Sequence, residues 1–286
     1  MNMKKIFLMA ALCLPLLAAC DKEDLGASDI RVPAFDYDAL SQTDKYIYDN
    51  YTVPYNIDVV YRWNQGDMSS DDMRRNLVPP REEQVEPFLQ MIKTVWVDTY
   101  ASEVGAQTLR AYVPKVLLLT GSASYNDDGS TTEGTAEGGR QIVLYSVNDF
   151  NFQLDQIMSY AHVMHHEFAH ILHQTVEYDP EFENITPAYS SSWMQMNDQT
   201  ARSKGFITAY ASSNANEDFA EMVSQMLTHT AEEWNALIEG AGNAEAVADL
   251  RAKEAIVVAY MKNNWGVDMA TFQAKVVAAI EAAAQN

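Results

Sequence analysis

The histidines of this chain are gathered in one short stretch. Five of the six lie between residues 162 and 173. Within the stretch, His166 and His170 are four residues apart, so on a helix both imidazoles leave the same face one turn apart and can bind one zinc ion at about 2.0–2.1 Å. Glu167 lies beside them, where it can take a proton from a zinc-bound water. The spacing predicts a catalytic zinc site.

The remaining histidines have to be sorted by their position on that helix. Four of the five point into one stripe about 90° wide: His162, His166, His170 and His173. At a rise of about 1.5 Å per residue, His162 and His173 are roughly 16 Å apart along the axis, so one ion cannot bind both. His173 is a candidate third ligand or substrate contact if the helix ends before it. We expect His162 and His165 to be structural or surface residues.

A second stretch could complete the site. It runs Tyr210-Ala-Ser-Ser-Asn214-Ala-Asn-Glu217-Asp-Phe-Ala-Glu221 and leads into an apolar pattern typical of a helix. Glu217 and Glu221 are four residues apart and share a face, where two negative charges repel each other. The pair would be explained by a cation that the carboxylates bind, or by a histidine N–H that donates a hydrogen bond to them.

The elements that must position these residues can be read from apolar periodicity. It predicts helices over residues 40–50, 81–102, 154–174, 230–239, 244–263 and 269–284. It predicts strands over residues 55–63, 115–120 and 140–147. Pro87 indicates that the regular part of the second helix begins there.

Two segments near the strands bear on substrate binding. Strand 140–147 precedes the histidine helix, and we expect it to form the upper edge of a cleft and to pair with an extended substrate. Residues 122–139 are rich in Ser, Asn, Asp, Gly and Thr and predict a mobile surface loop, either a rim or lid of the cleft or a loop without a role. Residues 179–209 predict irregular structure.

Length and charge limit the class of protein. The chain has 286 residues, a formal net charge of −21 and a hydrophobic content of 48%. It can bury a sizeable core as one large domain or two small ones. We expect no nucleic-acid partner, because a polyanion would be repelled by a surface of the same sign.

The N-terminus is typical of a targeting segment. Residues 1–5 carry two lysines, and the apolar run 6–17 is too short to span a bilayer as a stable helix. The following Leu17-Ala18-Ala19-Cys20 resembles the lipobox of bacterial lipoproteins, which implies cleavage before Cys20 and lipidation of that cysteine. The alternative is an ordinary signal peptide that happens to contain Cys20. Without Cys13, the mature chain has one cysteine and no internal disulfide.

Residues 21–24, Asp-Lys-Glu-Asp, look like the surface-export signal of Bacteroidetes lipoproteins. We therefore expect a signal peptide over residues 1–19, a lipidated cysteine and flexible tether over 20–35, and a single domain over 36–286. The expected location is the bacterial outer membrane, with the domain exposed at the cell surface.

The two motif stretches resemble a known group of enzymes. An H-E-x-x-H motif followed by a helix with a third glutamate resembles the gluzincin branch of zinc metallopeptidases, and the string from Tyr210 to Glu221 looks like the anthrax lethal factor type of catalytic domain. No G-x-x-H follows His170, so the metzincin pattern is absent. With its N-terminus, the whole chain resembles the substrate import-associated zinc metallohydrolase lipoproteins of Bacteroidetes, also called putative zinc-binding metallopeptidases.

The resemblance implies a role for each residue. One zinc ion per chain would be bound by His166, His170 and Glu217. It implies that Glu167 is the general base, that Tyr210 donates a hydrogen bond to the oxyanion of the tetrahedral intermediate, and that Glu221 accepts from the free N–H of a ligand histidine.

The expected fold is α+β and zincin-like, with a small mixed sheet over the H-E-x-x-H helix and a helical C-terminal half. The expected function is a membrane-anchored zinc metallopeptidase that trims peptides or proteins for uptake. Two alternatives stay open: a non-catalytic zinc-containing accessory or ligand-capture lipoprotein of an outer-membrane nutrient import complex, and a metallohydrolase that acts on a non-peptide bond. Glu167 argues against a purely structural site, since such sites need no free carboxylate beside the ligands.

Overall fold

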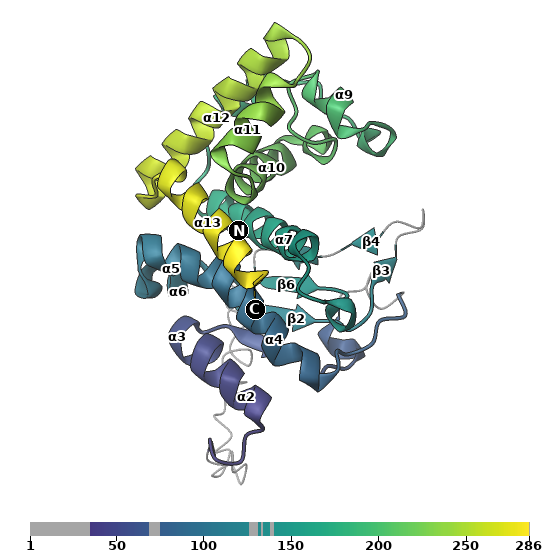
Figure 1. Ribbon diagram of the computed structural model, residues 1–286, viewed down its shortest axis with the longest axis vertical. Helices are drawn as coiled ribbons and strands as arrows, with labels where there is room; N and C mark the ends of the chain where they lie inside the picture. The colour runs from purple at the N-terminus through teal and green to yellow at the C-terminus, as the bar shows by residue number, and fades with distance from the viewer. Residues whose placement is uncertain (1–34, 69–74, 126–130, 133, 138–139, 286) are drawn as a thin grey trace, which may run out of the picture. The chain divides into compact units, whose positions relative to one another are not determined.

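The histidine-rich stretch lies on one long helix, α7, Leu154–Thr175. Its start agrees with the predicted one, and it ends one residue later. Ile157, Met164, Phe168 and Leu172 form its buried stripe. In the computed structural model α7 lies between the sheet and the C-terminal helices, packed against α10 and α13 on one side and strand β5 on the other (Figure 1). The clustered histidines are therefore carried by a helix in the middle of the fold.

The structure describes residues 35–285 except for 69–74, 126–130, 133 and 138–139. The predicted signal peptide, Cys20 and most of the tether lie outside the described residues. Residues 40–285 belong to one compact unit. None of the described helices is long and apolar enough to cross a membrane.

A small mixed sheet supports α7. Its strand order is β1-β2-β6-β5, with the following bounds: β1 Asp58–Val60, β2 Val116–Leu119, β6 Gln141–Leu144 and β5 Gly134–Glu137. β1, β2 and β6 are parallel, and β5 is antiparallel to β6. Leu117 and Ile142 face the main core, whereas Leu118 and Val143 belong to a smaller cluster, as the two-residue period of strands requires. The mixed α+β class is confirmed.

Two predictions about the strands were wrong. β6 pairs with β2 and with β5, so the strand predicted over 140–147 is internal, and β5 ends the sheet. Residues 122–139, predicted as a loop, contain β5 and a small antiparallel pair, β3 Ser124–Tyr125 and β4 Thr131–Thr132. These strands lack the apolar alternation by which a strand is recognised in a sequence. They form because pairing with neighbouring strands stabilises them.

The N-terminal half of the fold supplies short helices around the sheet. Their bounds are α2 Gln42–Ile47, α3 Val53–Tyr55, α4 Glu82–Ile92, α5 Asp98–Val104 and α6 Ala106–Tyr112. A π-helical segment, Lys93–Val97, joins α4 to α5. α4 begins at Glu82, so the predicted start at Pro87 was wrong. Pro87 removes only the hydrogen bond to the carbonyl of Glu83, an exposed residue that water can reach.

The C-terminal half is helical, as predicted. Its helices are α8 Glu181–Ile185, α9 Asp198–Arg202, α10 Ala215–Thr228, α11 Ala231–Glu239, α12 Ala244–Trp265 and α13 Met269–Ala283. Two 3-10 turns, Trp193–Gln195 and Tyr210–Ser213, lie before α10. The segment 179–209, predicted as irregular, thus includes two short helices and a turn.

Candidate metal centre

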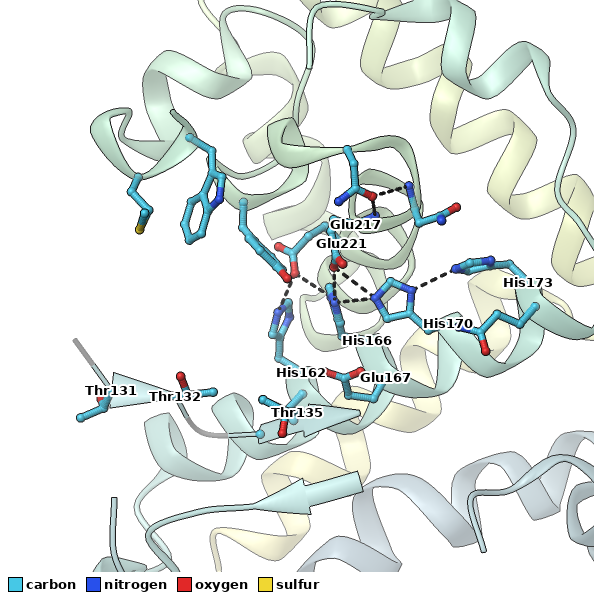
Figure 2. A pocket seen from close by; sticks show the side chains of 18 of the residues that line it. Thr131, Thr132, Thr135, His162, His166, Glu167, His170, His173, Glu217 and Glu221 are labelled. Carbon is cyan, nitrogen blue, oxygen red and sulfur yellow. Dashed lines mark hydrogen bonds and ion pairs between the residues drawn. The ribbon is translucent and has the colours of Figure 1, made fainter. Parts of the chain in front are cut away.

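Three ligand atoms from two helices converge on one point (Figure 2). His166 and His170 come from α7, and Glu217 comes from the first turn of α10. His166 Nε2 lies 3.0 Å from Glu217 Oε2, His170 Nε2 lies 3.1 Å from the same oxygen, and the two Nε2 atoms are 3.1 Å apart. These three residues, predicted from the sequence to act together, are brought together by the fold.

Local sequence explains why Glu217 is presented at the start of α10. Asn214 is the N-cap, and its side chain accepts from the backbone N–H groups of Asn216 and Glu217. The cap ends the preceding turn and starts the helix there. Phe219 and Val223 are buried in the core, which fixes the rotation of α10 about its axis. Glu217 therefore points toward α7.

A buried ion pair holds α10 beside α12. Lys253 of α12 is fully buried, and its Nζ donates to Asp218 Oδ2 at 2.5 Å and to the carbonyl of Gly205 at 2.8 Å. Tyr189 donates a further bond to the same carboxylate. Burial raises the pKa of Asp218 to about 6, although Lys253 acts against it. Removing either partner would leave a buried charge unpaired beside Glu217.

The donor set fits a zinc ion. The three candidate ligand atoms lie 3.0–3.1 Å from one another, close to the separation of roughly 3.3–3.4 Å that a tetrahedral zinc with bonds of about 2.0–2.1 Å gives its ligands. Burial lowers the pKa of His166, but the carboxylates of Glu217 and Glu221 outweigh it and raise that pKa to about 10. The site therefore favours a positive charge between its carboxylates and imidazoles.

Glu221 contacts the side of His166 that faces away from the three converging atoms. This carboxylate is buried, with Oε1 2.8 Å from His166 Nδ1 and 3.0 Å from His162 Nε2. Its Oε2 accepts from the hydroxyl of Thr208 at 2.7 Å. Burial alone would raise its pKa, but the two histidines hold the pKa of Glu221 well below its usual value. A carboxylate at Nδ1 favours the tautomer whose Nε2 lone pair is free to bind a metal.

Of the other histidines, His165 has the structural place that the sequence predicted, whereas His162 and His173 contact residues of the centre. α7 continues past His173, whose Nε2 lies 2.9 Å from His170 Nδ1, so His173 contacts a ligand and does not join the three converging atoms. Burial lowers the pKa of His173 to about 4. His162, expected to be structural or at the surface, contacts Glu221. His165 is fully buried between Tyr100 and Phe272.

Two side chains stand where chemistry would occur. Glu167 lines the cleft beside His166 and His170, and burial raises the pKa of its carboxyl above the usual value. The ring of Tyr210 stacks on His166 with centroids 5.8 Å apart. Burial and a hydrogen bond to Glu217 raise the pKa of the Tyr210 phenol well above 10, so it is a proton donor at neutral pH.

The centre opens into a cleft of about 1020 Å³. One side is formed by β4 and β5, with Thr131, Thr132 and Thr135 (Figure 2). Sequence reasoning missed further lining residues: Gly134, Trp193, Met194 and Met196. The four-residue spacing of His162 from His166 was a usable signal for His162, whereas nothing local marks Thr208 or the lining residues.

Comparisons with known proteins agree with this centre. A model of the family described as "Putative zinc-binding metallo-peptidase" matches residues 37–270. Among solved structures, the chain is similar to a putative zinc-binding metallo-peptidase from Bacteroides caccae ATCC 43185, at 33% sequence identity and a TM-score of 0.73, over 85% of this chain and 93% of that one. No curated protein matches. Because the family model spans most of the sequence, the chain belongs to the zinc-binding metallo-peptidase family.

Proposed function

We propose that this protein is a zinc-dependent peptidase that holds one zinc ion on His166, His170 and Glu217. The observation that carries the proposal is the convergence of their three ligand atoms within 3.1 Å, beside a glutamate in an open cleft. A closed structural zinc site uses four protein ligands, whereas a catalytic site keeps one position open.

The roles of the side chains follow from their places. When bound, zinc supplies a Lewis acid that polarises the peptide carbonyl and makes water nucleophilic at neutral pH. Glu167 accepts the proton of the attacking water and passes it to the leaving amine. Tyr210 donates to the oxyanion as it forms. Glu221 contacts Nδ1 of His166, and His173 contacts Nδ1 of His170, so these two residues fix the orientation of the ligand rings.

The free side of β5 offers a place for the peptide backbone. Within the described sheet, β5 is the end strand, and it lies against α7. An extended peptide can add to such a strand by main-chain hydrogen bonds. This moves the substrate-pairing role from strand 140–147 to residues 134–137.

A peptide pool tests the function. The zinc-loaded domain, residues 21–286, is incubated with diverse peptides, and products are read by mass spectrometry. We expect cleavage by the wild type and none after chelation. Glu167→Ala should keep zinc and lose nearly all activity, whereas Glu217→Ala should lose zinc. Glu232→Ala, which changes an exposed residue of α11, is the matched control and should behave like the wild type.

Two results would contradict the proposal. Full zinc affinity in Glu217→Ala would move the third-ligand role to His173. No cleavage by a protein shown to contain zinc would favour a hydrolase of non-peptide bonds or a ligand-capture protein of an import complex.

We also propose that the domain is anchored by lipid on Cys20 at the outer surface of a bacterial outer membrane and serves nutrient uptake. The support is the lipobox-like Leu17-Ala18-Ala19-Cys20 and the acidic stretch after it. In cells, Cys20→Ala should shift the protein from the membrane fraction to the soluble one, and protease added to intact cells should degrade the wild type. Unchanged fractionation of Cys20→Ala would refute the anchor.

A further inference from the structure

Large apolar side chains line the cleft. They are Trp193, Met194 and Met196; Met194 is 64% exposed, and the other two are half-buried. Leaving such side chains in water forgoes a favourable burial, so a group of them in one cleft indicates a binding surface. We name this group of three residues the apolar wall.

The apolar wall is coupled to the metal centre by ring contacts. The indole of Trp193 lies against the ring of Tyr210, with centroids 4.9 Å apart and planes at 65°. Tyr210 in turn stacks on the ligand His166. A group that contacts Trp193 is thus only one aromatic ring away from the reacting position.

The backbone holds the apolar wall in place. Ser190 donates to the carbonyl of Ser212, which ties the segment to the turn that carries Tyr210. Met196 donates to the carbonyl of Trp193 and closes the 3-10 turn, and Asn197 caps α9 immediately afterwards. The three side chains therefore stand on a fixed support.

The apolar wall and β5 are attached to different parts of the cleft. β5 lies against α7, whereas the turn Trp193–Gln195 lies against the turn of Tyr210, which packs on α10. An extended peptide beside β5 directs its side chains alternately to opposite sides. Because β5 and the apolar wall line the same cleft, the side chains on one side of such a peptide face into the space that the apolar wall borders.

We propose that the apolar wall selects a large apolar residue of the substrate, aliphatic or aromatic, within two positions of the cleaved bond. The proposal rests on the peptidase function and adds its substrate class. A tryptophan supplies a broad rigid surface, and two methionines adapt their flexible thioethers to side chains of different shape. The expected substrates are extended peptide segments with such a residue.

The test compares two end-blocked fluorogenic peptides that differ only by Leu or Ala at the position enriched in the peptide pool. We expect the wild type to prefer the Leu peptide by about 10–100-fold in kcat/KM. In Trp193→Ala/Met194→Ala this preference should fall to about threefold or less, because the Leu peptide loses its contacts while the Ala peptide does not. Val258→Ala, an exposed apolar change on α12, should keep the wild-type preference.

Each outcome decides the inference. No enrichment of Leu, Met, Phe, Tyr or Trp near the cleaved bond overturns it, and so does an equal loss of kcat/KM for both peptides in the double variant.

If the zinc-loaded wild type cleaves nothing, the peptidase function fails, and binding is measured instead by fluorescence anisotropy on zinc-loaded Glu167→Gln. Tighter binding of the Leu peptide that is lost when Trp193 and Met194 are replaced supports the apolar wall. Equal binding of both peptides overturns it.

Discussion

Replacing Glu221 by glutamine tests whether this residue tunes the metal centre. The carboxylate has three partners at 2.7–3.0 Å, and one of them is Nδ1 of the ligand His166. A hydrogen bond to a charged group contributes about 1.5–3 kcal/mol and one between neutral groups about 0.5–1.5 kcal/mol, so Glu221→Gln should weaken the contact by roughly 1–2 kcal/mol. The imidazole also becomes a weaker base.

The expected result is a zinc Kd raised about 10–100-fold, which equals roughly 1.4–2.7 kcal/mol. The affinity is measured by competition with a chromophoric chelator, and circular dichroism checks that the fold is intact. Glu232→Gln, an exposed change on α11, is the control. A folded Glu221→Gln protein with a zinc Kd within twofold of the wild type would refute the assignment, since Glu221 would then not act through His166.

Three further predictions concern stability. Lys253→Met leaves Asp218 buried without its cation and should lower the free energy of unfolding in urea by about 3–5 kcal/mol. The double variant Asp218→Asn/Lys253→Met should regain much of this loss. A loss below about 1 kcal/mol in Lys253→Met would contradict the role of the pair. A Cβ on Gly134 would lie 2.3 Å from Val163 Cγ1, so Gly134→Ala should lower the free energy of unfolding by about 1–3 kcal/mol, measured by thermal unfolding. Adding Val163→Ala should restore this stability, because it removes the clashing methyl group. Failure of that rescue would place the strain elsewhere. Zinc at about 1,000 times its Kd should stabilise the domain by about 4 kcal/mol and raise its Tm by roughly 8–16 °C in calorimetry, whereas an equal Tm with and without chelator would argue against a built metal site.

Much of the site could be predicted because its parts are local. The four-residue spacing of His166 and His170 sets their common face through helix geometry alone. Asn214 and the acidic residues after it mark the start of α10, so Glu217 could be placed in a first turn. The three last helices, α11, α12 and α13, were found by the same periodicity, within about two residues at their ends.

Other features depend on contacts between distant segments. The spacing of His162 from His166 indicates that they share a stripe, but the partner of His162 is known only once α10 brings Glu221 to 3.0 Å from its ring. The buried Lys253 resembles any helix-surface lysine in sequence, and only the packing of α12 on α10 pairs it with Asp218. Local patterns contain no information about such partners.

By itself, the sequence determined that this chain carries an H-E-x-x-H helix, a later acidic helix and a mixed α and β fold, because helix periodicity and capping act over a few residues. The tertiary structure alone decided which strand borders the cleft, where His173 and His162 point, and which apolar side chains stand in the cleft. The pairing of β6 with β2 leaves β5 as the end strand of the described sheet, and the turn at Tyr210 supports the apolar wall; both join segments that are not neighbours in the chain. Their free energy comes from contacts that exist only after the chain has folded.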